Sequence, residues 1–397
     1  EAQAQAACGA GRAPGLARGR RSASARQFRC RKEAQVPKCF RSVQCPFPQC
    51  QVAWATYGPI NYSLSGPASG EDDAELVVCV HGLNGTRLLF RDLEAHLSTS
   101  FKVLTFDLYG HGLSNAPRVD MCPCACARRC SRNASCGTPR GRYDLDFFVE
   151  QIAELLELAG LADAKMNLVG FSLGGAIAVA FAKRYPERVL RLVPMSPSGF
   201  IPNVPKVYWF LRMTWCVLVP LAPHLLCTCW YARERFAKSM RSGGQQMDEE
   251  VIQGIWSKFV WQLYVKRGVA SATLALCHRI PWFGLEGMFK DVGRSSRPVL
   301  LIWGDADTLN PPAVVAEKVK ECFSNAQLKV VKNAGHIAIC DKPRQVCWTI
   351  LAFLGMPLRT RMDEVQLSIP LLHAPDAADA PQCAPLRPPQ PVAPCGP

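Results

Sequence analysis

The sequence lacks an uninterrupted apolar run of about 20 residues, the length that a membrane-spanning helix needs. The nearest approach, residues 207–231, is interrupted by Arg212, Pro220, Pro223 and His224. A polytopic membrane protein is therefore excluded, and no internal repeat is visible. Charged residues make up only 20% of the 397 residues and apolar residues 49%. The chain thus has enough apolar material for a sizeable core, which excludes disorder throughout.

Acidic residues are scarce near the N-terminus. Residues 1–50 hold two acids and ten Lys or Arg, so they contribute +8 of the +14 formal charge. The rest of the chain is only mildly basic, so we expect no nucleic-acid partner, which would require a basic face on a folded unit. The Arg-rich segment has two interpretations, an organelle-targeting segment or a disordered tail, and the localisation stays open between them.

Composition and periodicity divide the chain into five parts. Residues 1–50 are a basic, Cys-containing tail, and residues 358–397 are a Pro-rich tail. Residues 51–198 and 298–357 form an α/β core, interrupted by a Cys-rich insertion at 119–142 and a helical cap at 199–297. Cysteines scattered through the apolar stretches of the body are predicted to be buried free thiols.

Short apolar runs alternate with helical patterns through the core. The predicted buried strands are residues 76–80, 103–106, 166–169, 189–193, 299–303 and 328–331, with a possible edge strand at 60–62. The predicted helices are residues 88–98, 143–160, 173–185, 312–322 and 343–355. This alternation indicates βαβ units and a mainly parallel sheet.

The strongest local pattern is GFSLGG at residues 170–175. Because it follows the apolar run MNLV and precedes a helical pattern, Ser172 lies on a predicted turn from strand to helix. Such a turn exposes the serine hydroxyl and needs small neighbours, which Gly170 and Gly174 supply. The pattern predicts a nucleophile at Ser172; the alternative is a glycine-rich turn with an incidental serine.

A serine nucleophile needs a histidine base and an acid that orients the histidine. Outside the C-terminal tail, His224, His278 and His336 follow Ser172. His336 lies in NAGH, directly after the last predicted strand, where a doubly wound sheet places its ligands. His224 and His278 fall in the apolar, Trp-rich stretch and are assigned to the cap. His336 is therefore the predicted base.

The acid is expected in GDADTLNP at residues 304–311, directly after the strand VLLIW. Asp307 is the predicted catalytic acid, and Asp305 is interpreted as a turn-former or helix cap. An oxyanion hole also needs backbone N–H donors. We expect them from Leu173, which follows the nucleophile, and from Leu83 in HGLNG, where Gly82 lets the loop bend. His81 is expected to organise this loop.

Five segments together resemble the α/β-hydrolase superfamily, in the lipase/esterase-like branch that includes monoacylglycerol lipases. They are HGLNG (81–85), DLYGHGLS (107–114), GFSLGG (170–175), WGDADTLNP (303–311) and NAGHIAI (333–339), in the family's order. The resemblance implies an α/β-hydrolase fold, with a mainly parallel doubly wound sheet and a helical cap inserted after the sixth strand. It favours Asp307 over Asp305, because the family's acid lies three residues after the Gly of its W-G-x-x-D segment. Relatives that carry Asp as the nucleophile on this turn are disfavoured, because position 172 is Ser.

The sequence departs from this family at the Cys-rich insertion, which carries Cys122, Cys124, Cys126, Cys130 and Cys136. The spacing differs from a usual zinc knuckle and includes no histidine, so we predict no metal site. A disordered loop, disulfide-linked in an oxidising compartment, is favoured. The cap holds six tryptophans, which either pack it against the core or make peripheral contact with a membrane.

The sequence therefore predicts a serine hydrolase that cleaves a lipid-like or small acyl ester through an acyl-enzyme, with no cofactor. Two alternatives stay open. The same triad serves C–C bond hydrolysis or acyl transfer, and a non-catalytic binding protein of the same fold is possible if the insertion fills the pocket.

Overall fold

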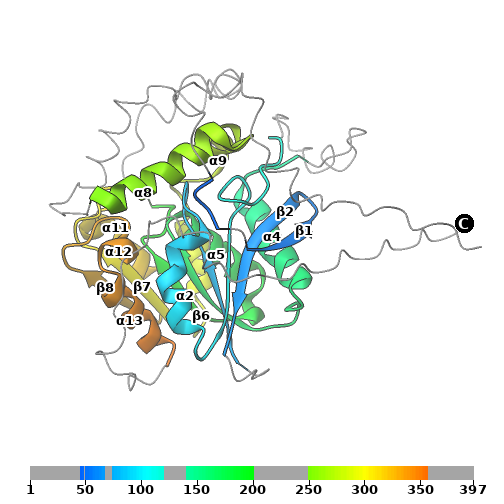
Figure 1. The fold of residues 1–397 in the computed structure, drawn as a ribbon. Coiled ribbons are helices and arrows are strands. Elements are labelled where there is room, and N and C mark those ends of the chain that lie inside the picture. The colour runs from blue at the N-terminus through cyan, green and yellow to red at the C-terminus, as the bar shows by residue number, and fades with distance from the viewer. Residues whose placement is uncertain (1–44, 49, 68–73, 120–139, 201–248, 356–397) are drawn as a thin grey trace, which may run out of the picture.

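The structure, a computed structural model, describes residues 45–48, 50–67, 74–119, 140–200 and 249–355 (Figure 1). Most of both predicted tails, the five-cysteine segment and the first half of the predicted cap lie outside these residues. Within the described ranges, no helix combines the length and hydropathy that a membrane span requires.

An eight-stranded sheet forms the centre of the described chain, in the order β1-β2-β4-β3-β5-β6-β7-β8. β1 and β2 pair antiparallel, β2 pairs antiparallel with β4, and all other neighbours are parallel. The mainly parallel sheet is confirmed. The strands are β1 Gln51–Ala55, β2 Gly58–Ser65, β3 Leu76–Val80, β4 Lys102–Phe106, β5 Met166–Phe171, β6 Val189–Met195, β7 Val299–Gly304 and β8 Ala326–Val331.

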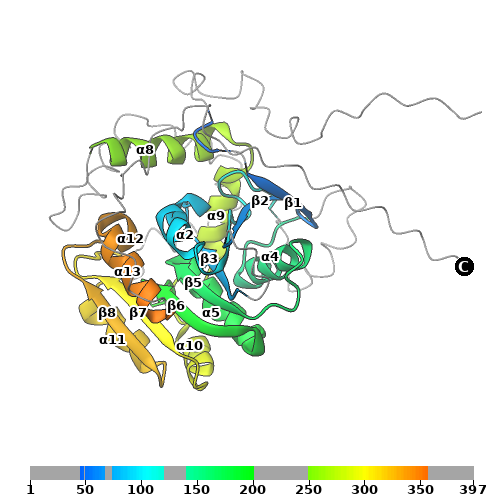
Figure 2. The same cartoon turned by 60° about the horizontal axis from the view of Figure 1, so that its bottom comes forward.

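Helices cover both faces of the sheet (Figure 2). One face carries α4 Leu145–Leu158, α5 Leu173–Arg184, α10 Glu286–Gly293 and α11 Pro312–Glu321. The other carries η3 Arg87–Phe90, α2 Arg91–Leu97, α12 Ala338–Asp341 and α13 Pro343–Phe353. The reason is visible in β3, where Val78 packs into the first layer while Val77 and Cys79 pack into the second. The sheet is doubly wound, as predicted.

Both edges of the sheet differ from the prediction. Residues 60–62 lie in β2, which is not an edge, because β1 pairs along its outer side. A tight turn joins the two strands, and Gly58 adopts a φ of +102° that favours glycine. At the other edge, β8 is largely exposed rather than buried, because it is the outermost strand and has a neighbour on one side only.

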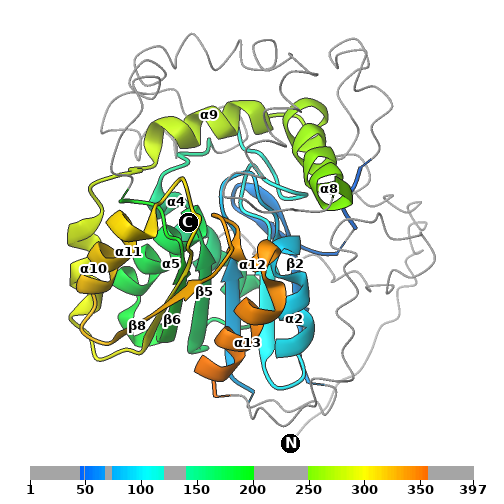
Figure 3. The ribbon, with the colours of Figure 1, turned by 90° about the vertical axis from the view of Figure 1, so that its left-hand side faces the viewer.

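The described part of the cap consists of α8 Glu249–Val260, the π-helix η5 Trp261–Val265 and α9 Val269–Arg279. These elements follow β6 in the chain, and Figure 3 shows α8 and α9 above one end of the sheet. The structure differs from the predicted cap boundary at α10, which packs on α5 in the core layer. Phe289 of α10 is fully buried there, and Asp291 pairs with Lys183 at 2.7 Å.

The three described cap tryptophans pack inward. Trp256 stacks on Phe259, and Trp261 meets the ring of Phe47 edge-on at 5.3 Å between centroids. Trp282 donates its indole N–H to the Cys277 carbonyl. For these three the packing interpretation is supported. The same contact shows that Phe47, which lies within the predicted N-terminal tail, is buried against the cap.

The scattered cysteines include buried free thiols, as predicted. Cys79, Cys322 and Cys347 are buried and unpaired. Burial raises the pKa of Cys347 to about 12, because a thiolate would be poorly solvated there. Such thiols stay protonated and fill space in the core.

Candidate active site

Ser172 stands at the sharp turn between β5 and α5, with β5 ending at Phe171 and α5 beginning at Leu173. Its backbone has a φ of 52° and a ψ of −116°, a conformation that is costly for a residue with a side chain. The neighbouring backbone holds it there: Ser172 N–H donates to the Met195 carbonyl at 2.9 Å, and Gly175 N–H donates to the Ser172 carbonyl at 2.9 Å. Strain of this kind presents the side chain outward from the turn.

Close packing, rather than positive φ, requires the flanking glycines. A Cβ at Gly170 would overlap the Gly174 carbonyl, and a Cβ at Gly174 would overlap the Val80 carbonyl of the adjacent strand β3. At Gly82 a Cβ would lie 3.1 Å from the Ser172 Cβ. The loop after β3 therefore runs directly beside the serine.

We expect Gly174→Ala to destabilise the protein by about 2–4 kcal/mol, because the new methyl group meets backbone that cannot move aside. Urea unfolding would measure this. Gly287→Ala is the matched control: it lies in α10 with nothing within 4 Å of the new Cβ, so it should be neutral or stabilise by up to about 1 kcal/mol. Equal unfolding midpoints for the two variants would contradict the steric argument.

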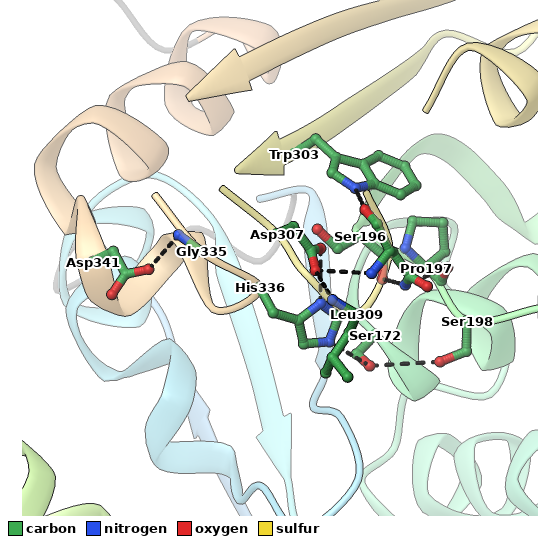
Figure 4. Close-up of polar contacts among 11 residues, drawn as sticks. Ser172, Ser196, Pro197, Ser198, Trp303, Asp307, Leu309, Gly335, His336 and Asp341 are labelled. Atoms are coloured by element: carbon green, nitrogen blue, oxygen red, sulfur yellow. Dashed lines mark hydrogen bonds and ion pairs between the residues drawn. The ribbon is translucent and has the colours of Figure 1, made fainter. Parts of the chain in front are cut away.

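The structure brings Ser172, His336 and Asp307 together, although they are far apart in the sequence (Figure 4). His336 Nε2 lies 3.1 Å from Ser172 Oγ, and His336 Nδ1 lies 2.8 Å from Asp307 Oδ2. All three residues follow parallel strands, β5, β7 and β8, whose carboxyl ends share one edge of the sheet. The arrangement matches a hydroxyl, a base and an orienting carboxylate in hydrogen-bonded order.

The second carboxylate oxygen of Asp307 is also fixed. Asp307 Oδ1 accepts the N–H groups of Leu309 and Asn310, each at 2.9 Å, and the side chain is buried. The carboxylate therefore faces His336 in one orientation. Asp305 has a different role, because its Oδ1 accepts the Ala334 N–H at 3.2 Å and braces the loop that carries the histidine.

Further contacts hold the His336 loop. Asp341 Oδ2 accepts the Gly335 N–H at 2.8 Å, and the Phe171 ring lies 5.1 Å from the imidazole between centroids. Gly304 has no Cβ to collide with the Gly335 carbonyl. Sequence reasoning missed Asp341; its position just after the NAGHIAI segment is the only signal that could have suggested it.

The two predicted N–H donors belong to segments next to Ser172: Leu173 follows it in the chain, and Leu83 follows Gly82, which approaches it. Leu173 begins α5, and the first N–H groups of an α-helix have no acceptor within the helix. Leu83 lies in the turn after β3, which is closed by a hydrogen bond of 3.1 Å from Gly85 N–H to the Gly82 carbonyl. Because Gly82 approaches Ser172, this turn is in place to serve an oxyanion beside the serine.

His81 organises this turn, because both of its ring nitrogens are bonded to backbone groups and not to the Ser172 hydroxyl. Its Nε2 accepts the Leu108 N–H at 3.0 Å, so the ring proton lies on Nδ1, which donates to the Gly82 carbonyl at 2.7 Å. Complete burial lowers the pKa of His81, which favours this neutral form. His81 thus joins the loop after β3 to the loop after β4.

Two polar residues that sequence reasoning did not single out complete the site. Ser198, just after β6, is buried with its Oγ 3.5 Å from Ser172 Oγ. Asp107, just after β4, accepts the N–H of Arg87 at 2.8 Å and the N–H of Leu113 at 2.9 Å, and so ties together loops next to the site. Their positions at carboxyl ends of strands were the available signal.

Among the described residues, no group of three or more His, Cys, Asp or Glu side chains is placed to hold a metal ion. The five cysteines at 122–136, for which we predicted no metal site, lie outside the described residues. That prediction therefore stays a prediction.

The sequence matches the alpha/beta hydrolase fold family over residues 75–215 and 234–343. A Bacillus subtilis protein provisionally named a 2-succinyl-6-hydroxy-2,4-cyclohexadiene-1-carboxylate synthase is 32% identical over 281 residues, covering 69% of this chain and 88% of that protein. A monoacylglycerol lipase of Xenopus laevis is 21% identical over 323 residues, covering 77% of this chain and 82% of the lipase.

Among solved structures, a thermophilic esterase from Thermogutta terrifontis superposes with a TM-score of 0.56 at 21% sequence identity. The match covers 77% of this chain and 98% of the esterase chain. At this identity the likeness concerns the fold.

Proposed function

This chain belongs to the α/β-hydrolase fold family, and from that premise we propose that it is a serine hydrolase of carboxylic esters with a lipid-like or small acyl group. One observation carries the proposal: the unbroken contact from Asp307 through His336 to the hydroxyl of Ser172, a residue held in strained backbone. The name of one similar protein, a monoacylglycerol lipase, supports an ester as the substrate.

In the proposed mechanism, Ser172 Oγ attacks the ester carbonyl while His336 Nε2 takes its proton. Asp307 accepts the Nδ1–H of the imidazole, which keeps Nε2 free as the base and stabilises the imidazolium as it forms. His336 then gives the proton to the leaving alcohol. The carbonyl carbon is left bonded to Ser172 as an acyl-enzyme.

The N–H groups of Leu83 and Leu173 would stabilise the negative oxygen of each tetrahedral intermediate. One comes from the loop after β3 and the other from the first residue of α5, and the absence of a side chain at Gly82 allows that loop to approach Ser172. His336 then activates a water molecule that attacks the acyl-enzyme, and Ser172 recovers its proton as the acid leaves. This chemistry requires no cofactor.

A second candidate uses the same triad for another reaction, C–C bond hydrolysis or acyl transfer to an alcohol. The relative at 32% identity favours keeping it, because that protein is named a synthase rather than an esterase. The choice between reactions depends on which acceptor or leaving group the cap admits. A panel of substrates therefore decides it.

The test is labelling of the folded full chain with a fluorophosphonate, followed by hydrolysis of p-nitrophenyl esters from acetate to palmitate. We expect labelling and a preference for one range of acyl length. Labelling with cleavage of a diketone and none of the esters would favour the C–C hydrolase. A folded chain that neither labels nor cleaves any substrate would overturn the enzymatic proposal in favour of a binding protein.

A further inference from the structure

The cap contributes a polar side chain to the loop that carries the Leu83 N–H. Gln262 lies in the π-helix η5, between α8 and α9, and its side chain is buried. A π-helix is a rare element that occurs frequently at functional sites, and a buried glutamine needs partners for its amide group. The hydrogen-bond partners of this buried amide therefore indicate the role of Gln262.

Both ends of the Gln262 amide are bonded to backbone of the core. Its Oε1 accepts the Gly112 N–H at 2.6 Å, and its Nε2 donates to the Asn84 carbonyl at 3.2 Å. A backbone N–H can only donate and a carbonyl can only accept, so these partners fix the orientation of the amide. Gln262 therefore bridges the loop after β4 and the loop after β3.

The bond to Asn84 connects to the Leu83 N–H through two peptide units. The Asn84 carbonyl belongs to the same peptide as the Gly85 N–H, which donates to the Gly82 carbonyl at 3.1 Å. The Gly82 carbonyl in turn shares its peptide with the Leu83 N–H. Because O and N–H point in opposite directions in a trans peptide, each bond in this chain directs the next N–H, and bonds in series polarise one another.

Contacts from two sides hold this turn. Asn84 has a φ of 56°, a left-handed conformation that asparagine adopts more readily than most residues with a side chain. The turn is held from the sheet side by His81, which donates to the Gly82 carbonyl. From the cap side it is held by Gln262, and Thr273 Oγ1 lies 3.5 Å from the Asn84 side-chain oxygen.

A second cap residue fixes the position from which Gln262 reaches the loop. Lys266, one helical turn further on, donates from its Nζ to the carbonyls of His111, Gly112 and Ser114. Burial lowers the pKa of Lys266 to about 7, and the nearby Asp107 carboxylate opposes that shift. Gln262 and Lys266 thus both anchor η5 to the loop after β4, which contains Gly112.

We propose that Gln262 is a positioning residue of the oxyanion hole, whose amide orients the Leu83 N–H through the Asn84–Gly85 and Gly82–Leu83 peptides. This inference rests on the proposed function, because it assigns Leu83 the task of binding the oxyanion. Its consequence is that the cap is part of the catalytic apparatus. Correct seating of the cap and stabilisation of the transition state are then coupled through one hydrogen-bond chain.

The decisive variant is Gln262→Glu, which has nearly the same shape and still accepts from Gly112. When ionised, its carboxylate cannot donate to the Asn84 carbonyl. We expect kcat to fall by about ten-fold at alkaline pH with KM changed less than about two-fold, since the bound oxyanion forms only in the transition state. As pH falls, the buried carboxyl protonates and donates again, so kcat relative to wild type should recover.

Gln262→Met is the second variant, because it removes both hydrogen bonds and cannot titrate. Its deficit in kcat should be independent of pH relative to wild type, whereas that of Gln262→Glu should vary. Ser257→Ala, an exposed hydroxyl on α8, is the cap control and should match wild type. Near-ultraviolet circular dichroism at each pH checks that every variant is folded, so that rates refer to folded protein.

The outcomes separate this inference from the proposed function. An active wild type together with Gln262 variants that keep wild-type kcat, or that raise only KM, would overturn the positioning role and leave the serine hydrolase intact. A folded wild type without labelling or turnover would remove the proposed function and this inference with it.

Discussion

Replacing Ser172 with alanine is expected to abolish fluorophosphonate labelling and to lower kcat for ester hydrolysis by about 10⁴-fold or more. Ser172 Oγ lies 3.1 Å from His336 Nε2, and among the described residues no other hydroxyl contacts that nitrogen. The variant is therefore left without an activated nucleophile. The methyl group of alanine fits the same turn. Labelling measured by in-gel fluorescence, and initial rates with the best ester of the panel, would provide both readings.

Ser198→Ala is the matched control for this variant. The two hydroxyl oxygens lie 3.5 Å apart, but in the described structure only that of Ser172 also contacts the imidazole. Ser198→Ala should therefore still form the adduct. Labelling that persists in Ser172→Ala and disappears in Ser198→Ala would show that Ser198, and not Ser172, is the nucleophile.

The second large effect is expected for Asp307→Asn, which should lower kcat by about 10⁴-fold while the fold is kept. The amide oxygen would accept the Leu309 and Asn310 N–H groups, as Asp307 Oδ1 does now. The amide NH₂ would then face His336 Nδ1 and donate to it. That contact forces the imidazole proton onto Nε2, so the ring can no longer take the proton of Ser172.

Asp305→Asn is the matched control two residues away. Its amide oxygen can still accept the Ala334 N–H, so we expect kcat within about ten-fold of wild type. Comparable losses in the two variants, or a larger loss in Asp305→Asn, would contradict the assignment of the acid. Steady-state rates at one pH, with folding checked by circular dichroism, are sufficient.

Local pattern was enough to predict the elbow around Ser172, because its determinants are contiguous. A strand, a serine with glycine two residues before and two residues after it, and a helix follow one another within about twenty residues. Asp307 and His336 were predictable for a related reason: each lies just after a short apolar run that predicts a strand, and parallel strands deliver their following loops to one edge of the sheet.

The sheet edges show where local pattern fails. The run at 328–331 resembles a buried strand, yet β8 is exposed, because burial depends on whether another strand or helix covers it. Similarly, Phe47 falls in residues 1–50, which composition alone assigns to a basic, Cys-containing tail. Its partners Trp261 and Val265 lie more than 200 residues further along the chain.

The layered α/β architecture and the turn that carries Ser172 could be predicted from the amino-acid sequence, since each follows from short-range periodicity or spacing. The choice of Asp307 and His336 also drew on the position of each after a predicted strand and on the resemblance to the α/β-hydrolases. The contacts of Gln262 with Asn84 and Gly112, 178 and 150 residues away in the chain, could not be predicted before the fold was known. These partners are backbone groups. A backbone N–H or carbonyl has the same identity at nearly every position, so no residue letter marks it as a partner until the chain has folded.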